Sequence, residues 1–134
     1  MDSVVHFELP ADDGKRSSEF YSKVFGWKTT QLGAEMGEYI VVETGPTDEK
    51  NNMAERPGFI NGGIFKKSKP EQGVSVVIAV EDINAAMKKV TDAGGTALGG
   101  QVAGVPDDIP GIGLYAAFID TEGNRMGMLQ PKGM

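Results

Sequence analysis

The stretch "VVHFELPADDGKRSSEFYSKVFGWK" (residues 4–28) predicts a strand that runs directly into a helix. Apolar and polar residues alternate over its first part, which is typical of a strand with one buried face. This alternation leaves His6, the only histidine of the chain, and Glu8 together on the opposite face. Asp13 can cap the start of the following helix, and Gly26 can end it. The stretch is therefore a strand–helix unit with a polar pair on its strand.

The same unit returns in the second half of the chain. The number of positions from Asp13 to Asp82 equals that from Gly26 to Gly95, so a second helix can start and end where the first one predicts. Shared order, spacing and stop signals indicate an internal repeat, and a repeat decides the architecture before any single element does. The alternative is a chance similarity between two ordinary strand–helix units.

Hydrophobic periodicity completes each half with three further strands. Strands are expected over residues 4–9, 27–31, 38–44, 59–67, 74–80, 96–103, 112–120 and 125–130, and helices over 15–25 and 83–93. A polar stretch with two prolines, residues 45–57, is expected to form a loop. The chain thus divides into two β-α-β-β-β modules, module one over about residues 1–69 and module two over about 70–134, within one domain spanning residues 1–134.

Paired modules of this kind, together with two local motifs, resemble the vicinal oxygen chelate superfamily. The motifs are "FYSKVFGW" (residues 20–27) at the end of the first helix and "DTEGN" (residues 120–124) before the last strand. The superfamily includes glyoxalase I, bleomycin-resistance proteins and extradiol dioxygenases, and the chain looks most like its small glyoxalase-like proteins related to lactoylglutathione lyase. The resemblance covers nearly the whole chain except residues 46–58. It implies an α+β fold in which two tandem βαβββ modules form a curved mixed sheet around a cleft.

The resemblance also implies where a metal would bind. Metal-dependent members hold a divalent ion through side chains on the first and last strand of each module, and the corresponding residues here are His6, Gly63, Ser75 and Gly127. A catalytic ion needs several fixed protein ligands besides open positions for the substrate. Two glycines and a neutral serine leave three of the four positions without a good ligand, so we expect no metal and no other cofactor.

If a metal does bind, His6 and Glu8 are the residues that we expect to hold it. Residues two apart on a strand lie about 6.6 Å apart at Cα. Both side chains could therefore contact one ion only with help from a third residue, for which Glu43 and Asp120 are the candidates.

His6 and Glu8 are also our candidates for catalytic residues. An imidazole titrates near neutral pH, and a carboxylate beside it can orient it or act alone. The alternative is a partly buried hydrogen-bonded pair that only stabilises the strand. We expect both side chains to line the cleft in either case.

Several other residues are expected to contact a ligand in the cleft. The candidates are Gly63, Ser75, Tyr115, Gly127, Trp27 and Phe65, with Tyr39 as a further apolar wall. Glycines at the ligand positions could deepen the floor of the cleft, or they could relieve crowding where a strand bends. Aromatic residues on strands are more often part of a core than of a site. Among them, Tyr115 offers a hydroxyl on a strand that approaches the cleft in this superfamily.

Two classes of function follow from the resemblance. The first is an enzyme, a lyase or isomerase of glyoxalase type with an unassigned substrate, which binds a small organic molecule in the cleft between the modules. The second is a metal-free protein that sequesters a ligand, as drug-resistance members of the superfamily do. A fold alone does not choose between them. A homodimer is expected, because superfamily members often pair their modules across chains and open sheets have edges to cover.

Composition narrows the partners and the location. The formal net charge is −6, and an acidic surface repels phosphate backbones, so nucleic acid is not an expected partner. The chain has no cysteine, which excludes disulfides, thiolate nucleophiles and iron–sulfur clusters. No apolar run approaches the roughly 20 residues that cross a bilayer, so no membrane partner is expected. No secretory signal precedes the first strand, and a cytoplasmic location is the expectation.

Overall fold

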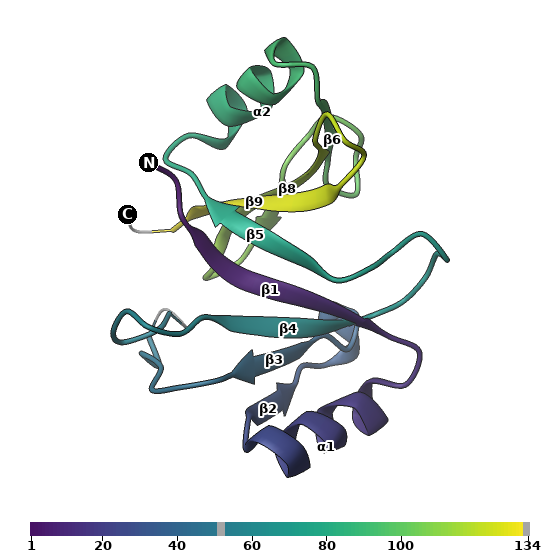
Figure 1. Cartoon of the computed structure of the whole chain (residues 1–134), viewed down its shortest axis with the longest axis vertical. Helices are drawn as coiled ribbons and strands as arrows, with labels where there is room; N and C mark the ends of the chain where they lie inside the picture. Colours follow the sequence, from purple (N-terminus) through teal and green to yellow (C-terminus); the bar gives the residue numbers. More distant parts are fainter. Residues whose placement is uncertain (51–52, 133–134) are drawn as a thin grey trace. The chain divides into compact units, whose positions relative to one another are not determined.

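The computed structural model describes residues 1–50 and 53–132, and within them the chain forms two compact units. One unit comprises residues 6–74, and the other comprises residues 1–5 together with the chain from residue 75 onward. Each unit carries one long helix and its own set of strands (Figure 1). The α+β class with two βαβββ modules is thereby confirmed. The two positions of the expected loop at 51 and 52, and the last two residues of module two, lie outside the described residues.

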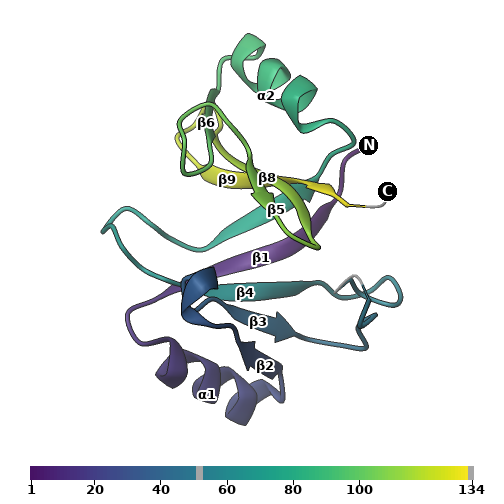
Figure 2. The same ribbon diagram turned by 180° about the vertical axis from the view of Figure 1, so that it is seen from behind.

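The first unit is a four-stranded mixed sheet with one helix against it, and its strand β1 begins two residues before the unit does. Its elements are β1 (Val4–Ala11), α1 (Gly14–Phe25), β2 (Lys28–Gln31), a short 3-10 helix η1 (Ala34–Met36), β3 (Ile40–Glu43) and β4 (Asn61–Lys66). The strand order is β2-β3-β4-β1, as Figure 2 shows, with β1 parallel to β4 and the other neighbours antiparallel. Helix α1 packs on β4 and β2.

The ends of α1 lie where the sequence predicts them. The Asp13 side chain accepts a hydrogen bond of 3.0 Å from the backbone N–H of Arg16, which satisfies one of the free donors of the first turn. Gly26 ends the helix in the left-handed conformation at φ 73°, and its N–H donates to the Ser22 carbonyl. A residue without Cβ adopts this conformation at little cost.

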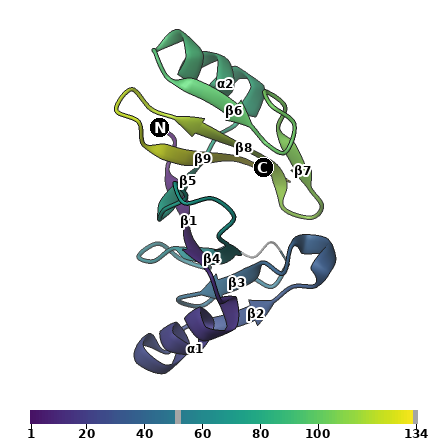
Figure 3. The ribbon, with the colours of Figure 1, turned by 90° about the vertical axis from the view of Figure 1, so that its right-hand side faces the viewer.

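The second unit repeats this plan with one added strand. Its elements are β5 (Ser75–Ala79), α2 (Ile83–Asp92), β6 (Thr96–Gly99), β7 (Asp107–Ile109), β8 (Gly113–Ile119) and β9 (Arg125–Pro131). The strand order is β5-β9-β8-β6, and β7 also pairs with β8 (Figure 3). Helix α2 packs on β6, β8 and β9. Its N-cap is Asp82, whose side chain accepts from the Ala85 N–H at 3.1 Å.

One expected strand, over residues 96–103, is wrong in its second half. The chain leaves β6 at Gly99, which has φ 81° and lies so close to the Gly104 backbone that a Cβ there would be 2.6 Å from the Gly104 nitrogen. The chain then returns to the same edge of β8 as β7. The sequence pattern predicts one strand over residues 96–103, whereas two short strands, β6 and β7, pair with this edge of β8.

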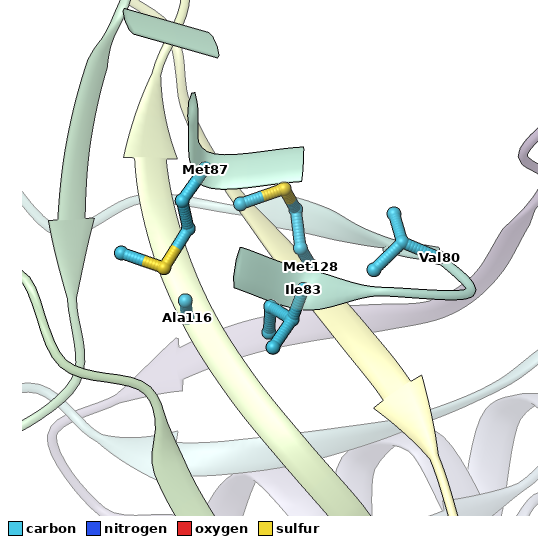
Figure 4. Close-up of a cluster of buried hydrophobic side chains, with 5 residues drawn as sticks. All are labelled: Val80, Ile83, Met87, Ala116 and Met128. Atoms are coloured by element: carbon cyan, nitrogen blue, oxygen red, sulfur yellow. The ribbon is translucent and has the colours of Figure 1, made fainter. Parts of the chain in front are cut away.

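Each unit has its own apolar core. In the second unit the buried side chains of the core cluster come from α2, β8, β9 and the residue after β5, and Figure 4 shows them: Val80, Ile83, Met87, Ala116 and Met128. In the first unit the core consists of Ala11, Ile40, Val42 and Ile64, with Phe7, Leu9 and Trp27 packed against it. Phe7 and Leu9 therefore mark the helix-covered face of β1.

The two helices differ in how deeply they are buried. Helix α2 buries Ile83 and Met87 completely or nearly so, whereas α1 buries no residue. The apolar side of α1 is instead an aromatic cluster in which Tyr21 stacks on Trp27 at 4.8 Å between ring centroids. Phe20, at the edge of this cluster, is 55% exposed. Helix α2 is thus held by its core, and α1 by ring contacts at the surface.

This difference predicts unequal costs for truncating the two helices. We expect Ile83→Ala to lower the free energy of unfolding by about 2–5 kcal/mol, because the side chain is fully buried and leaves a cavity. The matched change Phe20→Ala should cost below about 1 kcal/mol, because most of that ring already contacts solvent. Urea unfolding of both variants measures the difference, and equal losses would contradict it.

Candidate functional site

Three polar side chains of the first unit form one hydrogen-bonded cluster, which we call the triad: His6, Glu8 and Tyr39. The Tyr39 hydroxyl lies 2.9 Å from His6 Nε2 and donates a hydrogen bond of 2.8 Å to Glu8 Oε2. His6 Nε2 and Glu8 Oε2 are themselves 4.0 Å apart. Because Phe7 and Leu9 face the core, the alternation of the strand places His6 and Glu8 on the other face of the sheet.

The position of Tyr39 depends on a glycine in the neighbouring strand. Gly63 is the residue of β4 that pairs with Glu8 of β1, and it is buried. A Cβ built on Gly63 would overlap the hydroxyl end of the Tyr39 ring. The ring thus occupies the space that a side chain at position 63 would need. This is the close packing of a ring against backbone that only glycine permits.

Module two contains the same ring–glycine pair. A Cβ built on Gly127 would lie 2.8 Å from the Tyr115 ring. The strand registers agree as well: Gly127 pairs with Val77 of β5, just as Gly63 pairs with Glu8 of β1. The structure therefore supports the alignment of the two modules residue by residue.

The aligned positions differ in their polar residues. His6 and Glu8 of module one correspond to Ser75 and Val77 of module two. Both modules keep the tyrosine and the glycine, but only module one has titratable side chains at the two aligned positions of its first strand.

Burial shifts the pKa values of the triad in opposite directions. The His6 and Glu8 side chains are 30% and 15% exposed. Desolvation lowers the pKa of His6 to about 4, because the charged imidazolium loses its hydration. Desolvation also raises the pKa of Glu8 to about 7, and the Tyr39 hydrogen bond opposes that rise. At neutral pH, His6 is uncharged and Glu8 exchanges its proton readily, so the pair is not an ion pair.

The hydrogen-bond pattern assigns the protons when Glu8 is ionised. Tyr39 has one hydroxyl proton and donates it to Glu8. The contact between Tyr39 and His6 is then a bond in which His6 Nε2–H donates to the Tyr39 oxygen. The neutral imidazole consequently keeps its lone pair on Nδ1.

The other predicted site residues lie in different surroundings. Trp27 is on the helix side of the sheet, against Phe7 at 5.4 Å between ring centroids, and does not meet the triad. Phe65 follows Gly63 by two positions on β4, so it lies on the triad face. It also borders a shallow hollow of about 350 Å³ that reaches Asp12 and Glu38.

Three predicted residues belong to module two: Ser75 starts β5, and Tyr115 and Gly127 are in contact with each other. Their ligand-binding roles stay predictions. Tyr39 is predicted from the sequence only as an apolar wall, and the structure places its hydroxyl at the centre of the triad. The signal that could have found it is the recurrence of a tyrosine before a glycine-containing strand in both modules.

The residues present do not fit the metal site of the superfamily. Gly63 and Gly127 offer no ligand atom, and the space beside each is filled by a tyrosine ring. The two suggested extra ligands are engaged elsewhere: Glu43 pairs with Lys28 at 3.6 Å, and Asp120 accepts hydrogen bonds within its own turn. Within residues 1–50 and 53–132, no three side chains of the His, Asp and Glu types gather around a possible ion.

Comparisons with known proteins agree with this architecture. A family model described as bleomycin resistance protein-like N-terminal matches residues 3–45, which include all three residues of the triad. A glyoxylase-like domain-containing protein of Didymella fabae is 31% identical over 121 residues, covering 87% of this chain and 84% of that protein. The chain therefore belongs to the glyoxalase-like proteins of the vicinal oxygen chelate superfamily.

Solved structures show the same fold at low sequence identity. A hypothetical protein from Bacillus halodurans C-125 superposes with a TM-score of 0.68 at 13% identity, covering 99% of this chain and 96% of that chain. A methylmalonyl-CoA epimerase variant of Streptomyces coelicolor gives 0.68 at 14% identity over 97% and 94% of the two chains. The epimerase of Mycobacterium tuberculosis gives 0.65 at 12% over 96% and 87%.

None of the helices in the two described ranges has both the length and the apolar character that crossing a membrane requires.

The contact between Tyr39 and Gly63 predicts the effect of adding one methyl group. We expect Gly63→Ala to push the Tyr39 ring away, break its hydrogen bonds to His6 and Glu8, and lower the free energy of unfolding by about 1–3 kcal/mol. Since His6 is the only histidine, its ring signals in an NMR spectrum report the loss directly. The matched control Gly127→Ala disturbs Tyr115 and should leave the His6 signals in place; a shift of equal size would contradict the local origin of the effect.

The pKa values predict opposite changes in the pH dependence of stability. Glu8 is easier to protonate in the folded chain, so its contribution is full below about pH 4.5 and is lost as the pH rises through about 7. His6 is harder to protonate in the folded chain, so its contribution is full above about pH 6.5 and is lost as the pH falls through about 4.

Replacing either Glu8 or His6 should leave only the contribution of the other residue to the pH dependence of the free energy of unfolding. Relative to wild type, Glu8→Gln should make the free energy of unfolding rise more steeply from about pH 4.5 to 7, and His6→Gln should flatten its rise from about pH 4 to 6.5, each by about 1–3 kcal/mol in total. Urea unfolding across this pH range measures both profiles. Parallel profiles for wild type and both variants would contradict the shifts.

Proposed function

We propose that the chain is a small-molecule isomerase or lyase of glyoxalase type whose proton-transfer site is the triad of module one. The observation that carries the proposal is the buried carboxyl of Glu8, held by the Tyr39 hydroxyl at 2.8 Å, with a pKa of about 7. A proton-transfer group works best when its pKa lies near the working pH, because it is then both available and strong enough. Membership of the glyoxalase-like proteins supports the same class of reaction.

The proposed chemistry is removal of a proton next to a carbonyl group. Glu8 in its ionised form accepts the proton, the C–H bond breaks, and its electron pair moves toward the carbonyl oxygen to give an enolate. In an α-hydroxy carbonyl substrate, the hydroxyl proton moves to the former carbonyl oxygen and the hydroxyl carbon becomes the new carbonyl carbon. The protonated Glu8 returns its proton to the former carbonyl carbon, which completes an isomerisation. A lyase reaction differs only in its second half, in which the electron pair expels a leaving group.

The three residues of the triad have separate tasks in this proposal. Glu8 moves the proton. Tyr39 holds the Glu8 oxygen through its hydroxyl and holds His6 through its oxygen. His6 stays neutral because of its lowered pKa, and it positions the substrate instead of exchanging protons with it. The function proposed here needs no metal ion, in keeping with the two glycines at family ligand positions.

Solvent deuterium exchange tests this proposal without knowledge of the natural substrate. The protein is incubated in heavy water with a panel of small uncharged hydroxyketones and hydroxyaldehydes, and deuterium next to the carbonyl is followed by mass spectrometry. We expect incorporation with wild type, and Glu8→Gln should reduce its rate by about 10²–10⁴-fold. The control Glu43→Gln, in the same unit but paired with Lys28, should keep the wild-type rate.

A second candidate is a protein that binds its ligand without changing it. The match of residues 3–45 to the bleomycin resistance protein-like family model favours it, because this segment contains the whole triad. Under this alternative, a ligand is recovered unchanged and no compound of the panel gains deuterium. Exchange that depends on Glu8 would decide for the isomerase or lyase, and saturable binding without exchange would decide for the binding protein.

A further inference from the structure

The protons of the triad restrict which ligands its surroundings can hold. When Glu8 is ionised, the Tyr39 O–H donates its hydrogen bond to Glu8, and the His6 Nε2–H donates to the Tyr39 oxygen. Both donors of the triad are therefore engaged inside it. Two acceptors remain: the lone pair of His6 Nδ1 and the second oxygen of Glu8, for which the described residues provide no hydrogen bond.

These acceptors are partly accessible. The His6 side chain is 30% exposed and that of Glu8 is 15% exposed, so a small molecule can reach both without unfolding the strand. In the contacts described for it, the carboxylate has a hydroxyl and a neutral imidazole as neighbours, and neither balances its charge. A buried carboxylate in such surroundings favours a ligand that donates hydrogen bonds or carries positive charge.

We infer that the triad selects an uncharged or cationic ligand bearing hydroxyl or amino groups, and that it rejects carboxylates and phosphates. An anion would find two acceptors and no free donor, and it would approach an ionised carboxylate. A hydroxyl or ammonium group can donate to Glu8 and to His6 Nδ1 together. The inference rests on the proposed function only in taking the triad as the place where the ligand binds.

Tyr39 sets this preference through its single proton. Its oxygen accepts a hydrogen bond from His6 Nε2–H, so that the imidazole presents only the acceptor Nδ1 to a ligand. Phenylalanine at position 39 would keep the ring over Gly63 but would release His6 Nε2–H as a free donor. Tyr21 stacks on Trp27 on the helix-covered side of the same unit, and it provides the matched tyrosine control.

Binding of three related probes tests the inference. Benzylamine, benzyl alcohol and benzoate share one ring and differ in charge and donors, and each is titrated into the protein at about pH 8.5, where Glu8 is ionised. The NMR signals of His6 report contact at the triad without ambiguity, because the chain has no other histidine. We expect saturable shifts with the amine and the alcohol, and an affinity for benzoate at least about tenfold weaker than for the amine.

The variants separate the causes of the preference. Glu8→Gln should remove most of the advantage of the amine over the alcohol, because the charge is gone. Tyr39→Phe should raise the affinity for benzoate, and Tyr21→Phe should leave the order of the three probes unchanged. Thermal unfolding confirms that each variant is folded. Benzoate binding as tight as benzylamine binding in wild type, or no His6 shift with the amine and the alcohol, would overturn the inference.

The binding experiment tests the ligand preference separately from the proposed catalytic function. If no deuterium exchange is found but the probes bind in the expected order, the proposed isomerase or lyase function fails and the ligand preference stands. If exchange occurs and depends on Glu8 while benzoate binds as well as benzylamine, the preference fails and the function stands.

Discussion

The candidate site depends on one contact, the Tyr39 ring lying over the backbone of Gly63. The glycine lets the ring approach the sheet, and the ring carries its hydroxyl to a point within hydrogen-bond distance of both His6 and Glu8. Without that approach, the two side chains of β1 would be separate polar groups on a half-buried strand. The bridge makes them one unit, in which each proton has a defined position.

The same contact bears on the metal site that the superfamily implies, because it involves one of the four ligand positions. Position 63 corresponds to a ligand position in metal-dependent members of the superfamily, and here the Tyr39 ring fills the space that a side chain would need. What remains at the site is a carboxyl whose proton is loosely held near neutral pH and an imidazole that stays uncharged. Such a pair is suited to moving a proton and to accepting hydrogen bonds. The proposed function and the proposed ligand class both rest on these properties of Glu8 and His6.

Much of the fold could be read from the sequence because its signals are local. The caps Asp13 and Asp82 and the stop at Gly26 lie within one helical turn of the elements that they bound. Strand β7 was missed, because it has three residues and depends on a turn at Gly99 that periodicity does not record. The face on which Trp27 lies was also not foreseen, since it is decided by ring contacts with Phe7 and Tyr21.

The sequence predicts two of the three residues of the triad, because only those two depend on a local pattern. His6 and Glu8 lie on one strand, and their shared face follows from alternation alone. Tyr39 is 31 positions from Glu8, and its role depends on the register of β3 against β4 and of β4 against β1. A one-residue shift in either register would turn the hydroxyl to the other face of the sheet. Pairing of that kind is a property of the folded chain and leaves little trace in a single sequence.

The tyrosine–glycine pair in module two suggests how such a site can arise. Module two contains a second copy of this packing arrangement, in which the Tyr115 ring lies against the sheet at Gly127. Chemistry can then be gained or lost by changing the two neighbours on the first strand, with no rebuilding of the core beneath them. Ser75 and Val77 occupy those two places. The repeated module thus separates the packed scaffold, which the two halves share, from the polar residues on the first strand, in which they differ.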